Sequence, residues 1–372
     1  MRLRFCAWAA PVFLGLIRFG FPFLFATTVF AADSAEDRSM HLVVAVEGRV
    51  AVKHKGWASY APAVFGTDLR PGDLLKIDEN SRVRVVCSDL ELHDIPAGIT
   101  GVPCSSSRPV LQRPDGSIIN TTRSLPTEAV FPQVLSPRKT KLLSLQPVLR
   151  WTPVAGATRY KVTVRGGGYN WAKIVYSSTE IAYPDEAPKL RTGIDYKLIV
   201  ETDDNRSSYE PGSDLGFSIL KTEDQKRVLQ EERRIENLGL PDGPTQFLIA
   251  RLYASYGLRA EAIEKLEHTL SKFKAAAVPE LLGDLYASIG LVRQSETNDL
   301  NAIELAQSEN DEIGLMFAHL ALGRMYKQGL NNPRAAIVHF DSALDLARKL
   351  GDNLTATEAG ENLAELKKIG MR

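Results

Sequence analysis

The chain has 372 residues, which is too long for one compact core and enough for two or three domains. Hydrophobic residues make up 44% and charged residues 24% of the chain, a composition that excludes wholesale disorder. The 45 basic side chains equal the 45 acidic ones, and this zero net charge argues against a general binder of nucleic acid or anionic membranes, which needs a basic excess.

Residues 1–31 have the pattern of an export signal. Arg2, Arg4 and Arg18 supply positive charge, Phe19–Phe30 is a short apolar core, and Ala31 ends a cleavage site of small residues. The alternative is a retained membrane anchor, but Arg18 divides the apolar stretch into halves shorter than the roughly 20 residues that span a bilayer. We therefore expect a bacterial protein that is periplasmic or secreted, with no transmembrane span in the mature chain.

Two cysteines, Cys87 and Cys104, remain after this signal is removed. An even number of cysteines in an exported chain predicts a disulfide. A zinc site would need histidines at ligand spacing, and His93 stands alone between the two cysteines. The sequence therefore favours a disulfide and predicts no metal.

Residues 40–104 carry the pattern of short β-strands. Segments 41–46 and 49–54 flank a hairpin-like break at Glu47-Gly48, and Leu74–Ile77 follows a turn. In Ser81–Val86 valines alternate with arginines, which is the period of a half-buried strand.

The glycines and strands of this segment resemble the FecR-like domain, an extracytoplasmic β-module of bacterial sensor-regulators. The likeness is carried by Gly48-Arg49-Val50, Gly66, Gly72-Asp73 and the strand that ends at Cys87. In sensor-regulators this module follows a cytoplasmic helical region and a membrane span. Because only a signal peptide precedes it here, the resemblance implies the β-module without the anti-sigma part of that function.

The next two segments are predicted to be a linker and a second β-domain. Residues 105–139 contain three consecutive serines and five prolines with little periodicity, which predicts a semi-extended linker. Within 140–221, Pro147–Trp151 is an apolar strand, and segments 160–165 and 196–201 alternate apolar with polar residues. An L-x-x-G-x-x-Y spacing is formed by Leu190, Gly193 and Tyr196. This segment resembles a fibronectin type III or immunoglobulin-like sandwich, which implies a tyrosine corner at Tyr196.

The rest of the chain is predicted to be helical. Residues 222–242 are densely charged, with a narrow apolar stripe of Val228, Leu229 and Ile235, and this pattern indicates a solvated linker helix that packs on the next domain. Within 243–372 one motif recurs, as Ile249-Ala250-x-x-Tyr253, Leu282-Gly283-x-x-Tyr286 and Leu322-Gly323-x-x-Tyr326. In the helix that follows each copy, the small positions are Ala262, Ser295 and Ala336.

These three units resemble the tetratricopeptide repeat, in which small residues set the contact between paired helices. The small residues of successive units are 33 and then 40 residues apart, which predicts lengthened helices around Ser308–Gly314. Leu354–Ile369 is expected to be a capping helix. The fold class is therefore multidomain, with two small all-β domains followed by an all-α solenoid of tetratricopeptide-like hairpins.

The repeat alignment also predicts a partner-binding groove. The exposed groove positions are expected to be Arg251, Ser255, Asp284, Ser288, Arg324, Lys327 and Gln328. They describe a polar groove with basic ends and a central acid, suited to a peptide that bears carboxylates. The alternative is that Arg251 and Arg324 only pair with Asp284 or with solvent.

No motif of an enzyme is found, neither a nucleophile elbow nor a zinc-protease, phosphate-loop or dinucleotide motif. The acid pair Asp203-Asp204 is expected in a hairpin turn, and no catalytic residue, cofactor or metal is predicted. The sequence thus predicts a non-enzymatic extracytoplasmic scaffold that binds a peptide or protein partner. The alternatives are an envelope sensor that acts through the FecR-like domain, and a cell-wall glycan binder that uses Trp57, Tyr169 and Trp171.

Overall fold

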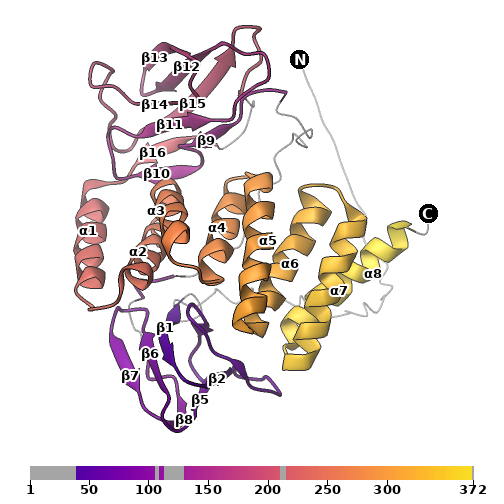
Figure 1. Cartoon of the computed structure of the whole chain (residues 1–372). Coiled ribbons are helices and arrows are strands. Elements are labelled where there is room, and N and C mark those ends of the chain that lie inside the picture. The colour runs from indigo at the N-terminus through magenta and orange to yellow at the C-terminus, as the bar shows by residue number, and fades with distance from the viewer. Residues whose placement is uncertain (1–38, 105–108, 113–129, 210–214, 371–372) are drawn as a thin grey trace, which may run out of the picture.

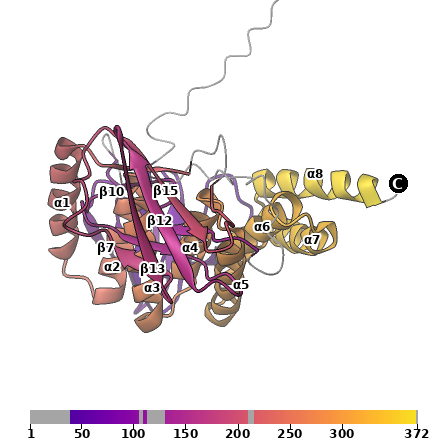
Figure 2. The same cartoon turned by 90° about the horizontal axis from the view of Figure 1, so that it is seen from above.

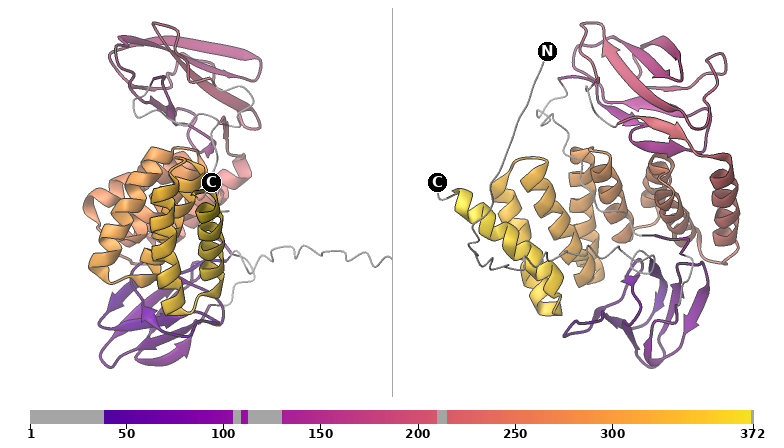
Figure 3. Two further views of the ribbon diagram at one scale, coloured as in Figure 1. Left: turned by 90° about the vertical axis from the view of Figure 1, so that its right-hand side faces the viewer. Right: turned by 180° about the vertical axis from the view of Figure 1, so that it is seen from behind.

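The structure is a computed structural model that describes residues 39–104, 109–112, 130–209 and 215–370. The predicted signal peptide, residues 1–31, and most of the predicted linker lie outside the described residues. A layer of helices stands between two β-domains (Figures 1 and 3). This arrangement confirms the predicted fold class of two β-domains and a helical solenoid.

The first β-domain is built from two four-stranded sheets, in the orders β4-β1-β6-β7 and β3-β2-β5-β8. Its strands are β1 (His41–Glu47), β2 (Val50–Lys53), β3 (Ala61–Pro62), β4 (Asp68–Leu69), β5 (Leu74–Ile77), β6 (Arg82–Val86), β7 (Leu92–Ile95) and β8 (Gly98–Gly101). The alternation predicted for β6 is confirmed, because Val83 and Val85 are buried in the core between the sheets.

The hairpin-like pairing expected around Glu47-Gly48 is wrong. Strand β1 pairs with β4 and β6, whereas β2 pairs with β3 and β5 in the other sheet. Gly48 takes the chain from one sheet to the other and lies so close to Ser81 that a side chain would collide with it. The Ser81 hydroxyl accepts a hydrogen bond of 2.9 Å from the Arg49 amide and fixes this crossing.

The second β-domain is a sandwich of a five-stranded sheet, β10-β16-β15-β12-β13, and a three-stranded sheet, β14-β11-β9. Its strands are β9 (Val134–Ser136), β10 (Thr140–Leu142), β11 (Val148–Trp151), β12 (Arg159–Gly166), β13 (Tyr169–Tyr176), β14 (Glu180–Ala182), β15 (Asp195–Thr202) and β16 (Phe217–Ile219). Trp151 and Tyr196 are buried at its centre. The Tyr196 hydroxyl accepts a 2.9 Å hydrogen bond from the Arg191 amide, the contact expected of a tyrosine corner.

The sandwich begins earlier than the sequence indicated. Strand β9 lies inside the segment expected to be linker, and it pairs with β11. Its own composition gives little sign of a strand, because prolines flank it on both sides. Its pairing partner β11, which meets it at Arg150 and Trp151, supplies the hydrogen bonds that define it.

The described residues form eight helices, α1 to α8, in antiparallel pairs. Their bounds are α1 (Thr222–Glu236), α2 (Asp242–Ser255), α3 (Arg259–Lys272), α4 (Ala277–Ser288), α5 (Val292–Glu309), α6 (Glu312–Gln328), α7 (Pro333–Leu350) and α8 (Asn353–Gly370). Helices α5 and α6 have 18 and 17 residues, against 14 and 12 in α3 and α4, so the lengthening expected from the repeat spacing is confirmed. None of these helices is long and apolar enough to span a membrane, as far as the described ranges extend.

One hydrogen bond recurs through the array and defines two types of helix. The tyrosine of each L-G-x-x-Y copy donates to a glutamate of the preceding helix, at 2.8, 2.5 and 2.7 Å. The pairs are Tyr253 with Glu232, Tyr286 with Glu267, and Tyr326 with Glu296. Helix α1 contributes Glu232 in the same way as α3 and α5 contribute theirs. We therefore call α2, α4, α6 and α8 A-type helices, and α1, α3, α5 and α7 B-type helices.

The first β-domain packs on the edge of the array where B-type helices lead into A-type helices. Phe65 contacts the rings of Phe247 and Phe273 at 5.1 and 4.9 Å between centroids. A Cβ on Gly66 would overlap the Cβ of Ala277 in α4, so this glycine allows the close approach. The hydrophobic core is therefore continuous between the first β-domain and the helices, because side chains of both belong to the same buried clusters.

The sandwich packs on the opposite edge, over the loops that follow α2 and α4. The Arg138 side chain is 4% exposed and donates to the Ile289 carbonyl at 2.7 Å. The Leu143 amide donates to the Glu261 carboxylate at 2.7 Å. Seen from above, the sandwich covers the α1–α4 end, and α7 and α8 lie beyond it (Figure 2). Both edges of the array are thus occupied at this end.

Candidate partner-binding groove

The A-type helices share one face, which we call the groove, defined by Arg251 of α2, Asp284 of α4 and Arg324 of α6. Each of these residues follows the small residue that packs against the B-type helix, as Gly323 packs against Phe340. The groove residues are turned away from that contact, and each is partly or largely exposed.

Next to α2 and α4 the groove opens into a cleft of about 850 Å³. The array lines it with Ser255, Asp284, Leu285 and Ser288, and the sandwich adds Lys197 and Phe217. Three of the seven predicted groove residues, Ser255, Asp284 and Ser288, therefore line one cleft, although Ser288 was expected to be exposed and is buried, with 9% exposure. The predicted array groove becomes an interdomain cleft because the sandwich forms its second wall.

The third unit differs, because α8 already binds its groove residues. Arg324 makes two hydrogen bonds to the Glu358 carboxylate, at 2.5 and 2.6 Å. Lys327 donates to Asn362 at 2.8 Å and to Glu365 at 2.6 Å, while Gln328 is exposed. Helix α8 was expected only to cap the array, but it lies where a fourth A-type helix would. The structure therefore does not bring Arg324 and Lys327 into the cleft with Asp284.

Ser255 is also contacted from within the chain. Its hydroxyl accepts a 3.1 Å hydrogen bond from the Gln112 amide and donates to the Arg251 carbonyl at 3.0 Å. Gln112 follows Leu111, which is fully buried in the core shared by the first β-domain and the array. The short segment 109–112 therefore covers the start of the groove on α2.

Two acidic residues that the sequence analysis did not select lie beside Asp284. Glu280 is one turn earlier on α4, and Asp299 of α5 is 3% exposed and packs against Gly283. Asp299 stands at the position that is Leu266 in the first unit and Phe340 in the third, four residues after Ala262, Ser295 and Ala336. The repeat alignment would have revealed it, because a carboxylate replaces an apolar residue at the packing position between helices.

The surrounding protein raises the pKa of all three carboxyls. Desolvation, with the neighbouring charge of Asp284, raises the pKa of Glu280 to about 8. Desolvation and the charges of Asp284 and Glu280 raise the pKa of Asp299 well above its usual range. Asp284 is open to solvent, yet protein on several sides desolvates it and raises its pKa, against the opposing charges of Arg251 and Arg324. Negative charge is therefore disfavoured on these three carboxyls.

The other charged residues of the cleft are of both signs. The sandwich side carries Lys139, Lys141 and Lys197 together with Asp195, while α1 adds Asp224 and the start of α3 adds Arg259. Arg259 donates to the Lys139 carbonyl at 3.1 Å. The distribution of charge thus differs from the predicted one: the cleft carries four bases and three acids on its two sides, and Arg324 is paired with Glu358 of α8.

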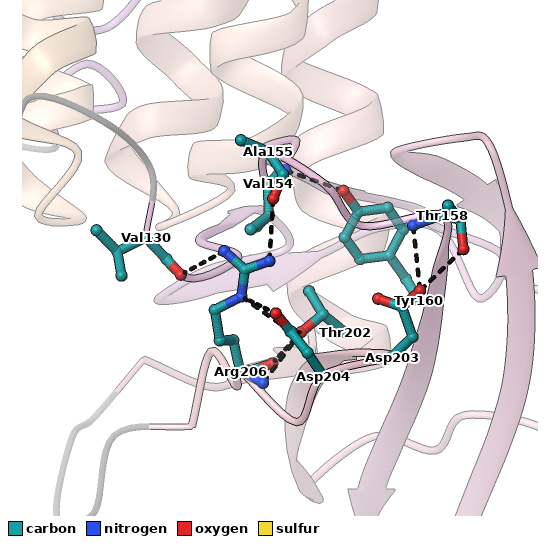
Figure 4. A network of polar contacts seen from close by, with 9 residues as sticks. All are labelled: Val130, Val154, Ala155, Thr158, Tyr160, Thr202, Asp203, Asp204 and Arg206. Atoms are coloured by element: carbon teal, nitrogen blue, oxygen red, sulfur yellow. Dashed lines mark hydrogen bonds and ion pairs between the residues drawn. The ribbon is translucent and has the colours of Figure 1, made fainter.

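The acid pair Asp203-Asp204 is held by hydrogen bonds within the sandwich. Asp203 accepts hydrogen bonds from Thr158, and Asp204 accepts from Arg206 and Thr202 (Figure 4). The hydrogen bond from Arg206, and then that from Thr202, lower the pKa of Asp204 to about 2. The hydrogen bond from Thr158 lowers the pKa of Asp203, so both acids are held ionised in this loop. Arg206 also donates to the carbonyls of Val130 and Ala155, which ties three loops of the sandwich together.

Cys87 and Cys104 lie at disulfide distance, with their Cα atoms 5.4 Å apart. The histidine beside them is His41, whose ring lies within 4.8 Å of both sulfurs, rather than His93. The Nδ1 atom of His41 accepts a hydrogen bond of 3.0 Å from the Ser88 amide. With the sulfurs bonded to each other, this buried group has no free thiolate to offer a metal ion.

Of the aromatic residues considered for glycan binding, two contact other rings. The ring centroids of Trp57 and His54 are 4.4 Å apart, and those of Trp171 and Tyr183 are 5.1 Å apart. Trp57 also lines a second cleft, of about 550 Å³, between the first β-domain and the helices α6 and α8. The side chain of Tyr169 is outside the described part of the structure.

No protein-family model and no curated protein matches the chain. Solved structures resemble part of it: BtubC (BKLC) from P. vanneervenii, with 19% identity and a TM-score of 0.34, and a tetratricopeptide repeat protein from Parabacteroides merdae, with 16% and 0.31. Both matches cover 39% of this chain, and they span 65% and 56% of those chains, less than two thirds of either. YrrB, described as a TPR protein with an unusual peptide-binding site, has 14% identity over 40% of this chain and 82% of its own, with a TM-score of 0.24.

Proposed function

We propose that the chain is a non-enzymatic extracytoplasmic scaffold that binds a peptide or protein partner in the cleft between α2, α4 and the sandwich. The observation that carries this proposal is the cleft of about 850 Å³, where polar groove residues of two A-type helices face a second domain. Solenoids of helical hairpins present extended concave surfaces to their partners. The predicted signal and the cysteine pair support a place outside the cytoplasm.

The two β-domains, which we interpret as FecR-like and as fibronectin- or immunoglobulin-like, would hold the array in position. They occupy its two edges, through the contacts of Phe65 and of Arg138, and leave the groove side of α4 exposed at Asp284. Sites that are built on such rigid elements keep their geometry without ordering on binding. A partner would therefore meet a preformed surface.

Photo-crosslinking in the native cells tests this function. A photoreactive phenylalanine analogue replaces Asp284 in the cleft and, as the matched control, Glu304, an exposed acid of α5 outside it. We expect a discrete crosslinked partner from position 284 and none from position 304. Crosslinking that is equal at both positions, or that occurs only at 304, would place the interaction surface elsewhere.

One feature favours the alternative function, a sensor that acts through the first β-domain. The second cleft lies at the contact of that domain with α6 and α8 and is lined by Trp57, Arg70, Phe317 and Asn353. A ligand there would touch both domains and strengthen their contact. If the partner of the full chain is lost in Trp57→Ala/Arg70→Ala but kept in Asp284→Lys, this alternative replaces the scaffold.

A further inference from the structure

Two histidines face each other across the third helical hairpin of the array. Helices α6 and α7 lie side by side (Figure 1), and His319 of α6 and His339 of α7 place their Nδ1 atoms 3.0 Å apart. Both side chains are partly exposed, so water and small ions reach them. The pair belongs to no motif of the sequence, since 20 residues separate its members.

The first unit makes the same contact with other side chains. His319 stands four residues before the small residue of its A-type helix, and His339 stands one residue before the apolar packing position of its B-type helix. The residues at these positions in the first unit are Gln246 and Lys265, and the Lys265 ammonium donates to the Gln246 side chain at 2.9 Å. An ammonium and an amide thus suffice to join the two helices here, whereas the third unit brings two imidazoles together.

The two rings are neutral, and a neighbouring side chain orients one of them. Desolvation lowers the pKa of His319, and desolvation together with the charge of His319 lowers the pKa of His339 to about 4. The Tyr326 ring stacks on that of His339, with centroids 5.4 Å apart, and the Tyr326 hydroxyl donates to Glu296 at 2.7 Å. Neutral imidazole is the form that binds metal ions. Both rings therefore offer a nitrogen lone pair at neutral pH.

The separation of the two Nδ1 atoms matches that of two nitrogens bound to one metal ion. With metal–nitrogen bonds of about 2.0–2.1 Å, two nitrogens lie about 2.9 Å apart at a right angle and about 3.3 Å apart at the tetrahedral angle. The 3.0 Å between His319 and His339 is nearer to the first value. Right angles between ligands are typical of the tetragonal geometry of copper(II) and nickel(II), whereas zinc is almost always tetrahedral.

The protein supplies two ligands at this place. Among the residues that the structure describes, no cysteine, carboxylate or further histidine joins the pair within 4.8 Å. Two imidazoles without a carboxylate do not suit magnesium or calcium, which take oxygen ligands. Among the divalent metals that imidazole does suit, copper(II) binds most tightly in the Irving–Williams order. The geometry and the ligand type therefore favour the same ion.

We propose that His319 and His339 bind one copper(II) ion through their Nδ1 atoms and that this ion links α6 to α7. The ion takes the place of the hydrogen that the two rings share, and the ring that donated it carries that proton on Nε2 instead. Each ring turns its Nδ1 lone pair toward the ion, and water fills the other positions. The two histidines are not part of the cleft at α2 and α4, so this inference does not rest on the proposed partner binding.

Titration of the mature protein, purified without a histidine tag, with copper(II) chloride tests the proposal. Calorimetry should find one ion per chain, and electron paramagnetic resonance should show coupling of the copper to two nitrogens. Because the ion binds only the folded hairpin, saturating copper should also raise the melting temperature by a few degrees.

The matched variant His319→Gln/His339→Lys installs the pair of the first unit, which keeps a contact between the helices and removes both imidazoles. We expect it to fold as the wild type does and to show a melting temperature that copper leaves unchanged. Its affinity for copper should fall by at least about 100-fold, since loss of even an outer-shell partner costs about 10–100-fold. His268→Gln, at an exposed histidine of α3, is the control that should bind copper as the wild type does.

The outcomes decide between a metal site and a plain contact. The pair is only a hydrogen bond between helices if the wild type binds no copper, or if the pair variant binds copper as tightly as the wild type. Coupling to a single nitrogen, or tighter binding of zinc(II) than of copper(II), would also overturn the proposal. If the pair variant does not fold, the single variant His319→Gln takes its place, because glutamine keeps a hydrogen-bonding group opposite His339, and unchanged copper affinity in it would refute the site.

Discussion

The replacement of Asp299 by leucine is expected to stabilise the protein. Leucine branches as aspartate does, and Leu266 shows that it fits this position in the first unit, even against Ala250, which is larger than Gly283. The two methyl groups that replace the carboxylate oxygens contribute about 0.8 kcal/mol each to the free energy of unfolding. Removal of a half-satisfied buried carboxylate adds about 1–3 kcal/mol. Crowding by the larger groups subtracts about 1 kcal/mol.

The net gain of about 2 kcal/mol corresponds to a rise of about 4–8 °C in the melting temperature of an array of this size. Thermal and urea unfolding, followed by far-ultraviolet circular dichroism, measure it. The reciprocal change, Leu266→Asp, places a carboxylate at the same position of the first unit and should destabilise the protein by about 3–5 kcal/mol.

The pH dependence checks the cause of this gain. Burial raises the pKa of Asp299 above that of the unfolded chain. The penalty that Asp299 imposes on wild-type stability is therefore absent below about pH 4, where the carboxyl is protonated in both states, and it grows as the pH rises. The leucine variant lacks this group, so its advantage should grow with pH. A variant that is less stable than the wild type, or an advantage that shrinks with rising pH, would refute the reasoning.

Three further predictions concern single contacts. Non-reducing mass spectrometry of protein recovered from the envelope should find Cys87 and Cys104 bridged, and two free thiols would contradict this; Cys87→Ser/Cys104→Ser should cost about 3 kcal/mol in chemical unfolding. Tyr286→Phe removes the hydroxyl that binds Glu267 and should cost about 1 kcal/mol; an unchanged urea midpoint would argue against this contact. Arg138→Met breaks a buried contact between sandwich and array and should lower the melting temperature by a few degrees, and no change would mean that the contact is absent in solution.

The features that the sequence revealed are those that follow from local patterns. The L-G-x-x-Y copies located α2, α4 and α6, because side chains three and four residues apart share a helix face. The alternation of Val83 and Val85 located β6, because successive residues of a strand face opposite sides. The 40-residue spacing between Gly283 and Gly323 predicted that the helices between them, α5 and α6, are longer.

The candidate site was predicted only in part, for two physical reasons. Asp284 and Ser288 could be placed on the groove because they follow the repeat. Glu280 and Asp299 were missed because a single charged residue carries little periodic signal, although the alignment of Asp299 with Phe340 contained the information. The role of Arg324 depended on Glu358, which lies 34 residues away and cannot be paired with it from local patterns.

The sequence by itself determined the helices of the array, several strands of both β-domains, the order of the domains and the tyrosine motif of each repeat. These properties depend on neighbours within a few residues, which set backbone preference and the face that is buried. Only the tertiary structure decided that β1 and β2 belong to different sheets, that α8 occupies the third unit's groove, and that the sandwich forms the second wall of the cleft. Each of these depends on contacts between segments far apart in the chain, such as Arg138 with Ile289, whose free energy is gained only when the whole molecule has folded.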